Sequence, residues 1–168
     1  MIVLVFGLPA SGKSWFARQF AEKLTASYLN TDMIRVQLGK TGQYDKDSKQ
    51  EIYDELKNLA IRNLKNKKDI IIDGTFHKKE RREDFFNLAD ENNTQIYLVE
   101  IKASESKVRE RLKKRKGYSE ADFEVYRQLK NEFEFPETDY LVLYNEDGNI
   151  NKLIDETMAY IKKKGKYG

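Results

Sequence analysis

"MIVLVFGLPASGKSW", residues 1–15, runs from an apolar stretch through a loop of small residues to a lysine and a serine. Gly7, Gly12, Lys13 and Ser14 satisfy the spacing G-x-x-x-x-G-K-[ST]. The apolar residues 2–6 have the composition of a buried β-strand. The stretch therefore predicts a strand, a phosphate-binding loop (P-loop) and the start of a helix.

The chemistry of this loop indicates a nucleotide site. Glycines let the backbone turn its N–H groups toward phosphate oxygens, and the helix that follows adds the positive end of its dipole. Lys13 is expected to reach the β- and γ-phosphates, and the Ser14 hydroxyl to ligate Mg²⁺. The residues expected to bind ATP are Gly7, Leu8, Pro9, Ala10, Ser11, Gly12, Lys13, Ser14 and Trp15.

Strand-like and helical segments alternate along the rest of the chain. Further apolar runs occupy 28–31, 69–73, 96–101 and 140–144. Helices are expected over 48–65, opened by the capping box Ser48-x-x-Glu51, over 104–116, from Ser119 to about 134, and over 149–163. Apolar strands separated by helices form parallel sheets covered on both faces, so we predict a three-layer α/β fold. With no linker or repeat, residues 1–168 are expected to form one domain.

Asp73 ends the apolar run "IIID" and is followed by Gly74. A carboxylate at the carboxyl end of a strand beside the P-loop is expected to hold Mg²⁺, directly or through water. The alternative is a helix or turn cap, for which aspartate is also favoured. The sequence Asn66-Lys67-Lys68-Asp69 spells the guanine-reading motif N-K-x-D, but it precedes the strand. Because ligands bind at the carboxyl ends of parallel strands, we interpret it as a polar turn.

Composition excludes several classes of site. The 168 residues contain no cysteine and a single histidine, His77, which rules out thiol chemistry and a histidine-rich zinc site. The net charge of +3 is too small to imply nucleic-acid binding by itself. The N-terminal apolar run is too short for a signal segment, and no stretch approaches a membrane span, so we expect a cytoplasmic protein without a membrane partner.

Asp32 and Arg35 follow the short strand at 28–31. Three residues apart, they would share a face of a helical turn, where the carboxylate could accept a proton from a hydroxyl and the guanidinium could hold an anion. Spacing alone favours the alternative, an aspartate N-cap followed by an exposed arginine.

Five segments occur in an order that resembles one group of P-loop kinases: "GLPASGKS", "NTDMIRVQL", "IIDGTFHKKERRE", "VRERLKKRK" and "SEADFEVYRQLKNEFE". The group includes polynucleotide 5′-kinases, zeta-toxin kinases, gluconate kinases and chloramphenicol phosphotransferases. The resemblance implies a P-loop NTPase fold with a five-stranded parallel sheet of order 2-3-1-4-5 and a helical lid at about 104–134. Trp15 departs from the group's commonest pattern, and we expect its ring to pack.

The resemblance also assigns roles. It implies that Asp32 is the general base on the acceptor hydroxyl and that Arg35 contacts the substrate. It further implies that Asp73 is the second-motif carboxylate and that Arg111 and Arg115 are lid arginines that close over the ATP phosphates. The alternative for 107–116 is a solvated cationic helix face, which is common on surfaces.

The sequence thus predicts a kinase that uses ATP and Mg²⁺ to phosphorylate a hydroxyl. A nucleic-acid 5′-end and a small metabolite both remain open as acceptors. For the former, Lys78, Lys79, Arg81 and Arg82 could form a basic rim with 113–116. The alternatives are an ATP-binding regulatory module without an acceptor and a toxin-like kinase of nucleotide-sugars. The sequence does not identify a partner protein.

Overall fold

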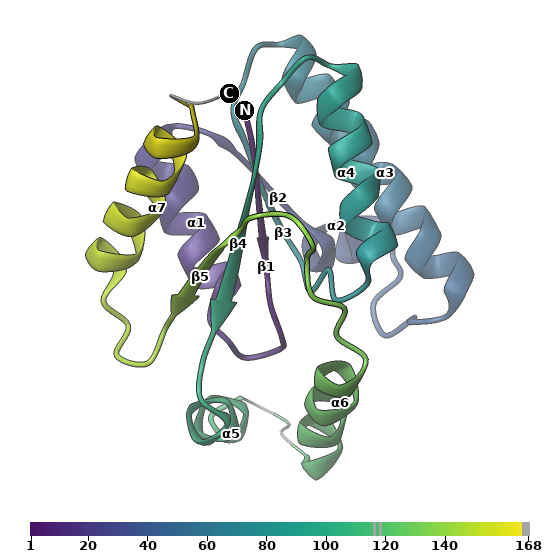
Figure 1. Ribbon diagram of the computed structural model, residues 1–168. Coiled ribbons are helices and arrows are strands. Elements are labelled where there is room, and N and C mark those ends of the chain that lie inside the picture. The colour runs from purple at the N-terminus through teal and green to yellow at the C-terminus, as the bar shows by residue number, and fades with distance from the viewer. Residues whose placement is uncertain (116, 118, 166–168) are drawn as a thin grey trace.

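Five parallel strands form the central sheet of the computed structural model, which describes residues 1–115, 117 and 119–165 (Figure 1). The strands are β1 (Ile2–Phe6), β2 (Ser27–Asn30), β3 (Ile70–Asp73), β4 (Ile96–Lys102) and β5 (Leu141–Tyr144). Their order is β2-β3-β1-β4-β5, and every neighbouring pair is parallel. The predicted fold class and strand order are confirmed.

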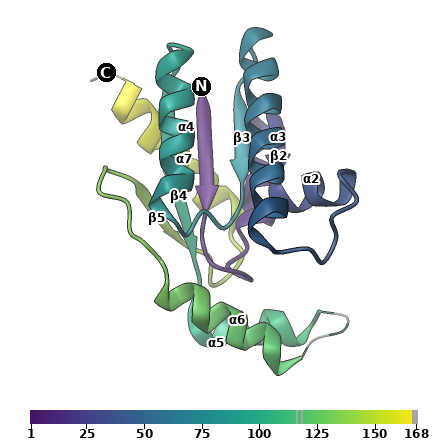
Figure 2. The same ribbon diagram turned by 90° about the vertical axis from the view of Figure 1, so that its right-hand side faces the viewer.

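Helices cover both faces of the sheet. Helices α1 (Lys13–Leu24) and α7 (Ile150–Gly165) lie on one face, and α3 (Lys46–Lys65) and α4 (Lys79–Glu91) lie on the other (Figure 1). The short helix α2 (Thr31–Gln37) follows β2. Helices α5 (Glu105–Lys113) and α6 (Glu120–Asn131) lie together beyond the carboxyl ends of the strands, as Figure 2 shows. The pair therefore stands at the end of the sheet where parallel α/β folds bind ligands.

Strand β1 explains why two layers of helices are needed. All five of its side chains are fully buried. Ile2, Leu4 and Phe6 pack with the α3–α4 layer, whereas Val3 and Val5 pack with the α1–α7 layer. Because successive side chains of a strand point to opposite faces, an uninterrupted apolar run requires a cover on each side.

A third, smaller apolar cluster joins α5 and α6 to the P-loop. Val108 and Leu112 of α5 meet Phe123 and Tyr126 of α6, with Ala10 of the loop in the same cluster. The helix pair is therefore packed on the loop that it would cover as a lid.

The bounds of α3 and α6 differ from expectation. Helix α3 begins at Lys46, because the Asp45 carboxylate accepts the Ser48 N–H, while the Ser48 hydroxyl donates to Gln43 instead of capping. The capping box at Ser48 was therefore wrong, whereas the one at Ser119 is confirmed. Helix α6 ends at Asn131, before the expected residue 134.

Helix α4 was not singled out by its sequence. Its segment, KERREDFFNLADE, is mostly charged, and its buried face holds an arginine besides Phe85, Leu88 and Ala89. Within the described residues, no helix is both long and apolar enough to cross a lipid bilayer.

Candidate functional site

The P-loop connects β1 to α1 in a conformation that two glycines make possible. Gly7 and Gly12 have φ angles of 144° and 91°, which L side chains rarely adopt. A Cβ atom at Gly7 would lie 2.4 Å from the Ile101 carbonyl oxygen, and one at Gly12 would lie 2.1 Å from Asn145 Nδ2. Helix α1 has no side-chain cap and no acidic residue in its first turn, so its N-terminus is well suited to an anion.

Lys13 is the centre of a cluster of charges. Its Nζ donates a long hydrogen bond of 3.4 Å to the Leu8 carbonyl oxygen. Burial lowers the pKa of Lys13, while the negative charges of Asp73 and Asp32 raise it and the positive charge of Arg115 lowers it further. The structure thus brings together four charged groups that the sequence placed on four separate segments.

Asp73 lies at the carboxyl end of β3 and is fully buried. Its Oδ2 accepts hydrogen bonds from Tyr28 Oη at 2.8 Å and from Asn30 Nδ2 at 2.5 Å. Its Oδ1 has no hydrogen-bond partner within the described part of the chain. Helix α4 begins six residues later at Lys79, and the Asp73 carboxylate accepts from no backbone N–H of the described residues. Asp73 therefore caps neither a helix nor a turn, and that alternative is wrong.

The donor set fits Mg²⁺. A carboxylate group with one unpartnered oxygen and the Ser14 hydroxyl are hard oxygen ligands, which Mg²⁺ prefers over nitrogen or sulfur. The described residues hold no cluster of three or more acidic, histidine or cysteine side chains that could enclose a metal. Mg²⁺ typically binds through one or two protein groups plus phosphates and water, so such a cage is not needed.

Asn30 was missed by sequence reasoning. Its side-chain oxygen accepts the N–H groups of Asp32 and Met33, so it caps α2, and its amide nitrogen holds Asp73. The alternative in which Asp32 is the cap is therefore wrong. An asparagine two residues before Asp32, at the end of the apolar run, was the available signal.

Asp32 and Arg35 have different surroundings although both lie on α2. Asp32 is exposed, whereas Arg35 is only 9% exposed. The Arg35 guanidinium donates to the Gln43 carbonyl oxygen and lies 4.5 Å from the centre of the Tyr44 ring. The alternative of an exposed arginine is therefore wrong. Here Arg35 holds the α2–α3 loop in place, and its contact with a substrate remains a prediction.

The two lid arginines also differ. Arg111 donates to the carbonyl oxygens of Ala10, Ser11 and Asn145 at 3.3, 2.9 and 2.7 Å, so it braces the P-loop. Arg115 is exposed, and its guanidinium makes no ion pair or hydrogen bond with the described residues. Arg115 is therefore the better placed of the two to meet phosphate charge.

Asn145 is a second residue that sequence reasoning missed. It follows β5, is 2% exposed, and donates from Nδ2 to the Ser11 carbonyl oxygen at 3.2 Å. Nothing in the local sequence distinguishes it, because its partner lies 134 residues away.

The expected basic rim is largely neutralised. Arg82 is 2% exposed and donates to the carbonyl oxygens of Phe76 and Glu134, so its placement on a rim was wrong. Lys78 and Lys79 form ion pairs with Glu134 and Glu137. Of the other rim residues, Arg81 lies over the Tyr53 ring, and Lys116 lies outside the described residues.

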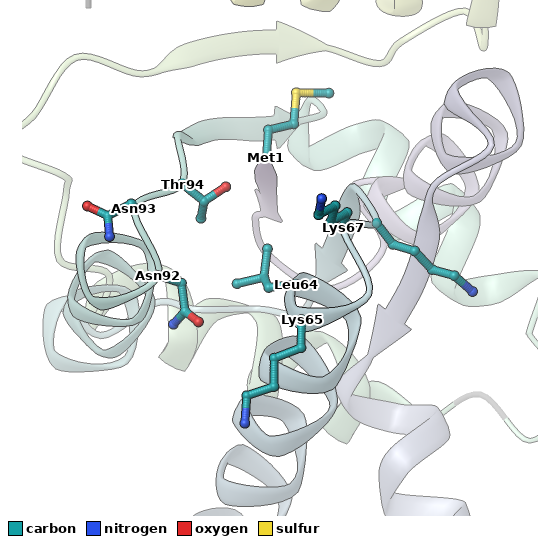
Figure 3. Close-up of a pocket in the computed structure, with 8 residues that line it drawn as sticks. Met1, Leu64, Lys65, Lys67, Asn92, Asn93 and Thr94 are labelled. Atoms are coloured by element: carbon teal, nitrogen blue, oxygen red, sulfur yellow. The ribbon is translucent and has the colours of Figure 1, made fainter.

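The rejection of the N-K-x-D motif agrees with the geometry. Asn66 caps the C-terminus of α3, ahead of β3, so the motif lies at the amino end of the sheet and away from the P-loop. A pocket of about 190 Å³ opens there, lined by residues that include Lys65, Lys67 and Asn92 (Figure 3). It contains none of the residues of the charge cluster around Lys13.

Two curated proteins match part of this chain. L-seryl-tRNA(Sec) kinase of Methanococcus maripaludis is 31% identical over 109 residues, 61% of this chain and 41% of that protein. The 2',3'-cyclic-nucleotide 3'-phosphodiesterase of Pongo abelii is 29% identical over 105 residues, 61% of this chain and 24% of that protein. The chain thus spans less than half the length of these curated relatives.

Solved structures share the fold. The Mycobacterium tuberculosis APS kinase CysC, solved in complex with AMPPNP and APS, superposes with a TM-score of 0.74 at 18% identity and covers 96% of each chain. A family described as an AAA domain, AAA_33, matches residues 2–136. Because this match covers most of its length, the chain belongs to the AAA_33 family of AAA domains, with the fold of a P-loop kinase.

Proposed function

We propose that the protein is an ATP- and Mg²⁺-dependent kinase that transfers the γ-phosphoryl group to a hydroxyl of an acceptor. The observation that carries the proposal is the convergence of Lys13, Asp73, Asp32 and Arg115 beside the P-loop, where each charge influences the protonation of Lys13. A loop that bound only a nucleotide would need no exposed carboxylate opposite the lysine.

The roles follow from where charge develops in phosphoryl transfer. The reaction depends mainly on positioning and on neutralising the phosphate oxygens. Lys13 and the N-terminus of α1 would hold the β- and γ-phosphates. Ser14 and Asp73 would hold Mg²⁺, which when bound would neutralise further phosphate charge. Arg115 would approach from the lid.

Asp32 would act as the general base. As the acceptor oxygen forms its bond to the γ-phosphorus, the bond from that phosphorus to the β–γ bridging oxygen breaks, and ADP leaves with the electron pair. The acceptor hydroxyl proton passes to the Asp32 carboxylate. The exposure of Asp32 and the capping of α2 by Asn30 support this role, since they keep the carboxylate open to an acceptor and fixed in orientation.

A compact acceptor fits the charges better than a long polynucleotide. Lys78 and Lys79 are paired with glutamates, and Arg82 is buried, so few free cations are available to follow a phosphate backbone. The match to L-seryl-tRNA(Sec) kinase covers only 41% of that protein, so its substrate is not carried over.

The test is ATP turnover with a panel of hydroxyl acceptors, which includes a 5′-hydroxyl oligonucleotide, for the wild type, Asp32→Asn and Asp32→Ala. Loss of a general base should lower acceptor-stimulated turnover by about 10²–10⁴-fold while ATP binding persists. Asp47→Asn, an equivalent change at an exposed position of α3, should retain activity. Stimulated turnover that survives in both Asp32 variants would exclude Asp32 as the base. Full ATP binding with no turnover on any acceptor would favour the regulatory module.

A further inference from the structure

A cavity of about 400 Å³ lies beneath the α5–α6 pair, beside the ends of β4 and β5. Glu100, Lys102 and Tyr144 line it from the strands. The alternate β4 residue Ile101 packs with the α1–α7 layer, so the Glu100 side chain points to the opposite face of the sheet. The cavity is thus on the far side of the sheet from α1, and it contains neither Lys13 nor Asp32.

Two buried polar atoms that line this cavity have no hydrogen-bond partner in the described part of the chain. Glu100 is 3% exposed; its Oε2 forms an ion pair with Lys102 Nζ at 3.2 Å but accepts no hydrogen bond from the described residues. Ser11 is 2% exposed, and its Oγ is also unpartnered. Buried polar atoms are nearly always hydrogen-bonded, so two orphans at one cavity point to a missing donor.

The charge around the cavity favours a positive ligand. Glu100, Glu105 and Glu146 contribute three carboxylates, against the two ammonium groups of Lys102 and Lys130. Burial raises the pKa of Glu100, and the nearby positive charge of Lys102 offsets this only in part. Arg82 also acts on Glu100, and the positive charge of a ligand beside this carboxylate would offset its burial further.

Aromatic rings form much of the remaining wall. Tyr126, Phe133, Phe135 and Tyr144 all line the cavity. Lys102 Nζ already lies 5.5 Å from the centre of the Phe135 ring. Such rings attract cations on their faces and offer apolar contact to a ligand body. Pockets of this volume with an apolar lining and a few polar groups are typical of small-molecule sites.

We propose that this cavity binds a small organic cation, in which an ammonium group donates to the Glu100 carboxylate while an aromatic or aliphatic body packs against Phe133 and Phe135. The cavity shares Leu8 and Ser11 with the P-loop but contains none of Lys13, Ser14, Asp32 and Asp73, and the proposal does not depend on the proposed kinase activity. Ser11 offers a second hydrogen-bond partner at the wall shared with the P-loop.

Isothermal titration calorimetry of the full chain tests the site. The probes are phenethylammonium and tryptammonium, each paired with its neutral alcohol, 2-phenylethanol or tryptophol. At least one amine should bind about tenfold more tightly than its alcohol. Glu100→Gln should bring each amine to within about twofold of its alcohol. Glu124→Gln removes an exposed carboxylate of α6 outside the cavity, and it should change nothing.

Equal affinity of amines and alcohols would overturn the proposal, as would the absence of saturable amine binding up to about 10 mM. If Glu100→Gln does not fold, Phe135→Ala takes its place, because Phe135 is 62% exposed and its removal should leave the fold intact. Amine binding that is unchanged by the loss of this ring would equally refute the site.

Discussion

Replacing Gly12 by alanine tests how the P-loop is held. The substitution would place a Cβ atom 2.1 Å from Asn145 Nδ2, inside any allowed contact distance. Asn145 would have to move, and its hydrogen bond to the Ser11 carbonyl oxygen would be lost. Alanine would also have to adopt a φ of 91°, a left-handed conformation.

The expected decrease in the free energy of unfolding has two contributions. A left-handed backbone disfavours a residue with a Cβ atom by about 1–2 kcal/mol. Loss of the buried Asn145 hydrogen bond adds about 1 kcal/mol. Gly12→Ala should therefore lower the free energy of unfolding by about 2–3 kcal/mol.

A matched control separates the two contributions. Gly39 also has a positive φ, 66°, but a Cβ atom there would meet nothing within 4 Å. Gly39→Ala should therefore show the backbone contribution alone, about 1–2 kcal/mol. The assay is equilibrium urea unfolding, followed by the fluorescence of Trp15, the only tryptophan, and by circular dichroism.

Combining Gly12→Ala with Asn145→Ala sharpens the test. Once the Asn145 amide is gone, the added Cβ has room, so the two changes together should be less destabilising than their sum by about 1 kcal/mol. The reasoning is refuted if the two effects simply add, or if Gly12→Ala destabilises no more than Gly39→Ala.

Three further outcomes are expected. Arg82→Met should lower the free energy of unfolding, measured in urea, by about 2–4 kcal/mol, because it leaves two backbone carbonyl groups without their buried donor. Arg127→Met, at the surface, should leave the free energy of unfolding nearly unchanged. Equal effects of the two substitutions would contradict this reasoning. Burial lowers the pKa of His77, so the unfolded chain takes up the proton first as the pH falls through about 6.5. In thermal unfolding, the wild type should therefore lose more stability between about pH 7.5 and 5.5 than His77→Gln does. Parallel profiles of stability against pH for the two proteins would exclude this linkage. Asp73→Asn should weaken the affinity for Mg²⁺ in the presence of ATP by about 10–100-fold, as measured by calorimetry. The variant should still bind ATP when no metal is present. An unchanged affinity for Mg²⁺ would show that Asp73 is not part of the metal site.

Sequence reasoning worked where a residue's partners are its near neighbours. The apolar run before Gly7 predicted β1, and its uninterrupted burial predicted helices on both faces. The capping box at Ser119 involves residues three apart, and it formed as expected. The capping box expected at Ser48 did not form, because the Asp45 side chain, three residues earlier, caps the helix instead.

The arginines show most clearly where sequence reasoning fails to predict the role of a side chain. The family resemblance assigned Arg35 to a substrate and Arg111 to phosphate, and the charge pattern placed Arg82 on a basic rim. In the structure each donates to backbone carbonyl oxygens, and the Ala10 partner of Arg111 lies 101 residues away. A guanidinium has five donors and a long stem, so the side chain's use depends on which carbonyl groups folding brings within reach.

The sequence by itself determined the parallel sheet, most of the helices that cover it and the presence of a phosphate loop, because spacing and local periodicity specify backbone conformation directly, although they did not reveal α4. Only the tertiary structure decided that Asp32, Asp73 and Arg115 surround Lys13, and that Asn145 and Arg111 brace the loop. Those contacts join segments that follow the carboxyl ends of different strands and are distant in the chain. They exist because a parallel sheet brings the carboxyl ends of all its strands to one edge.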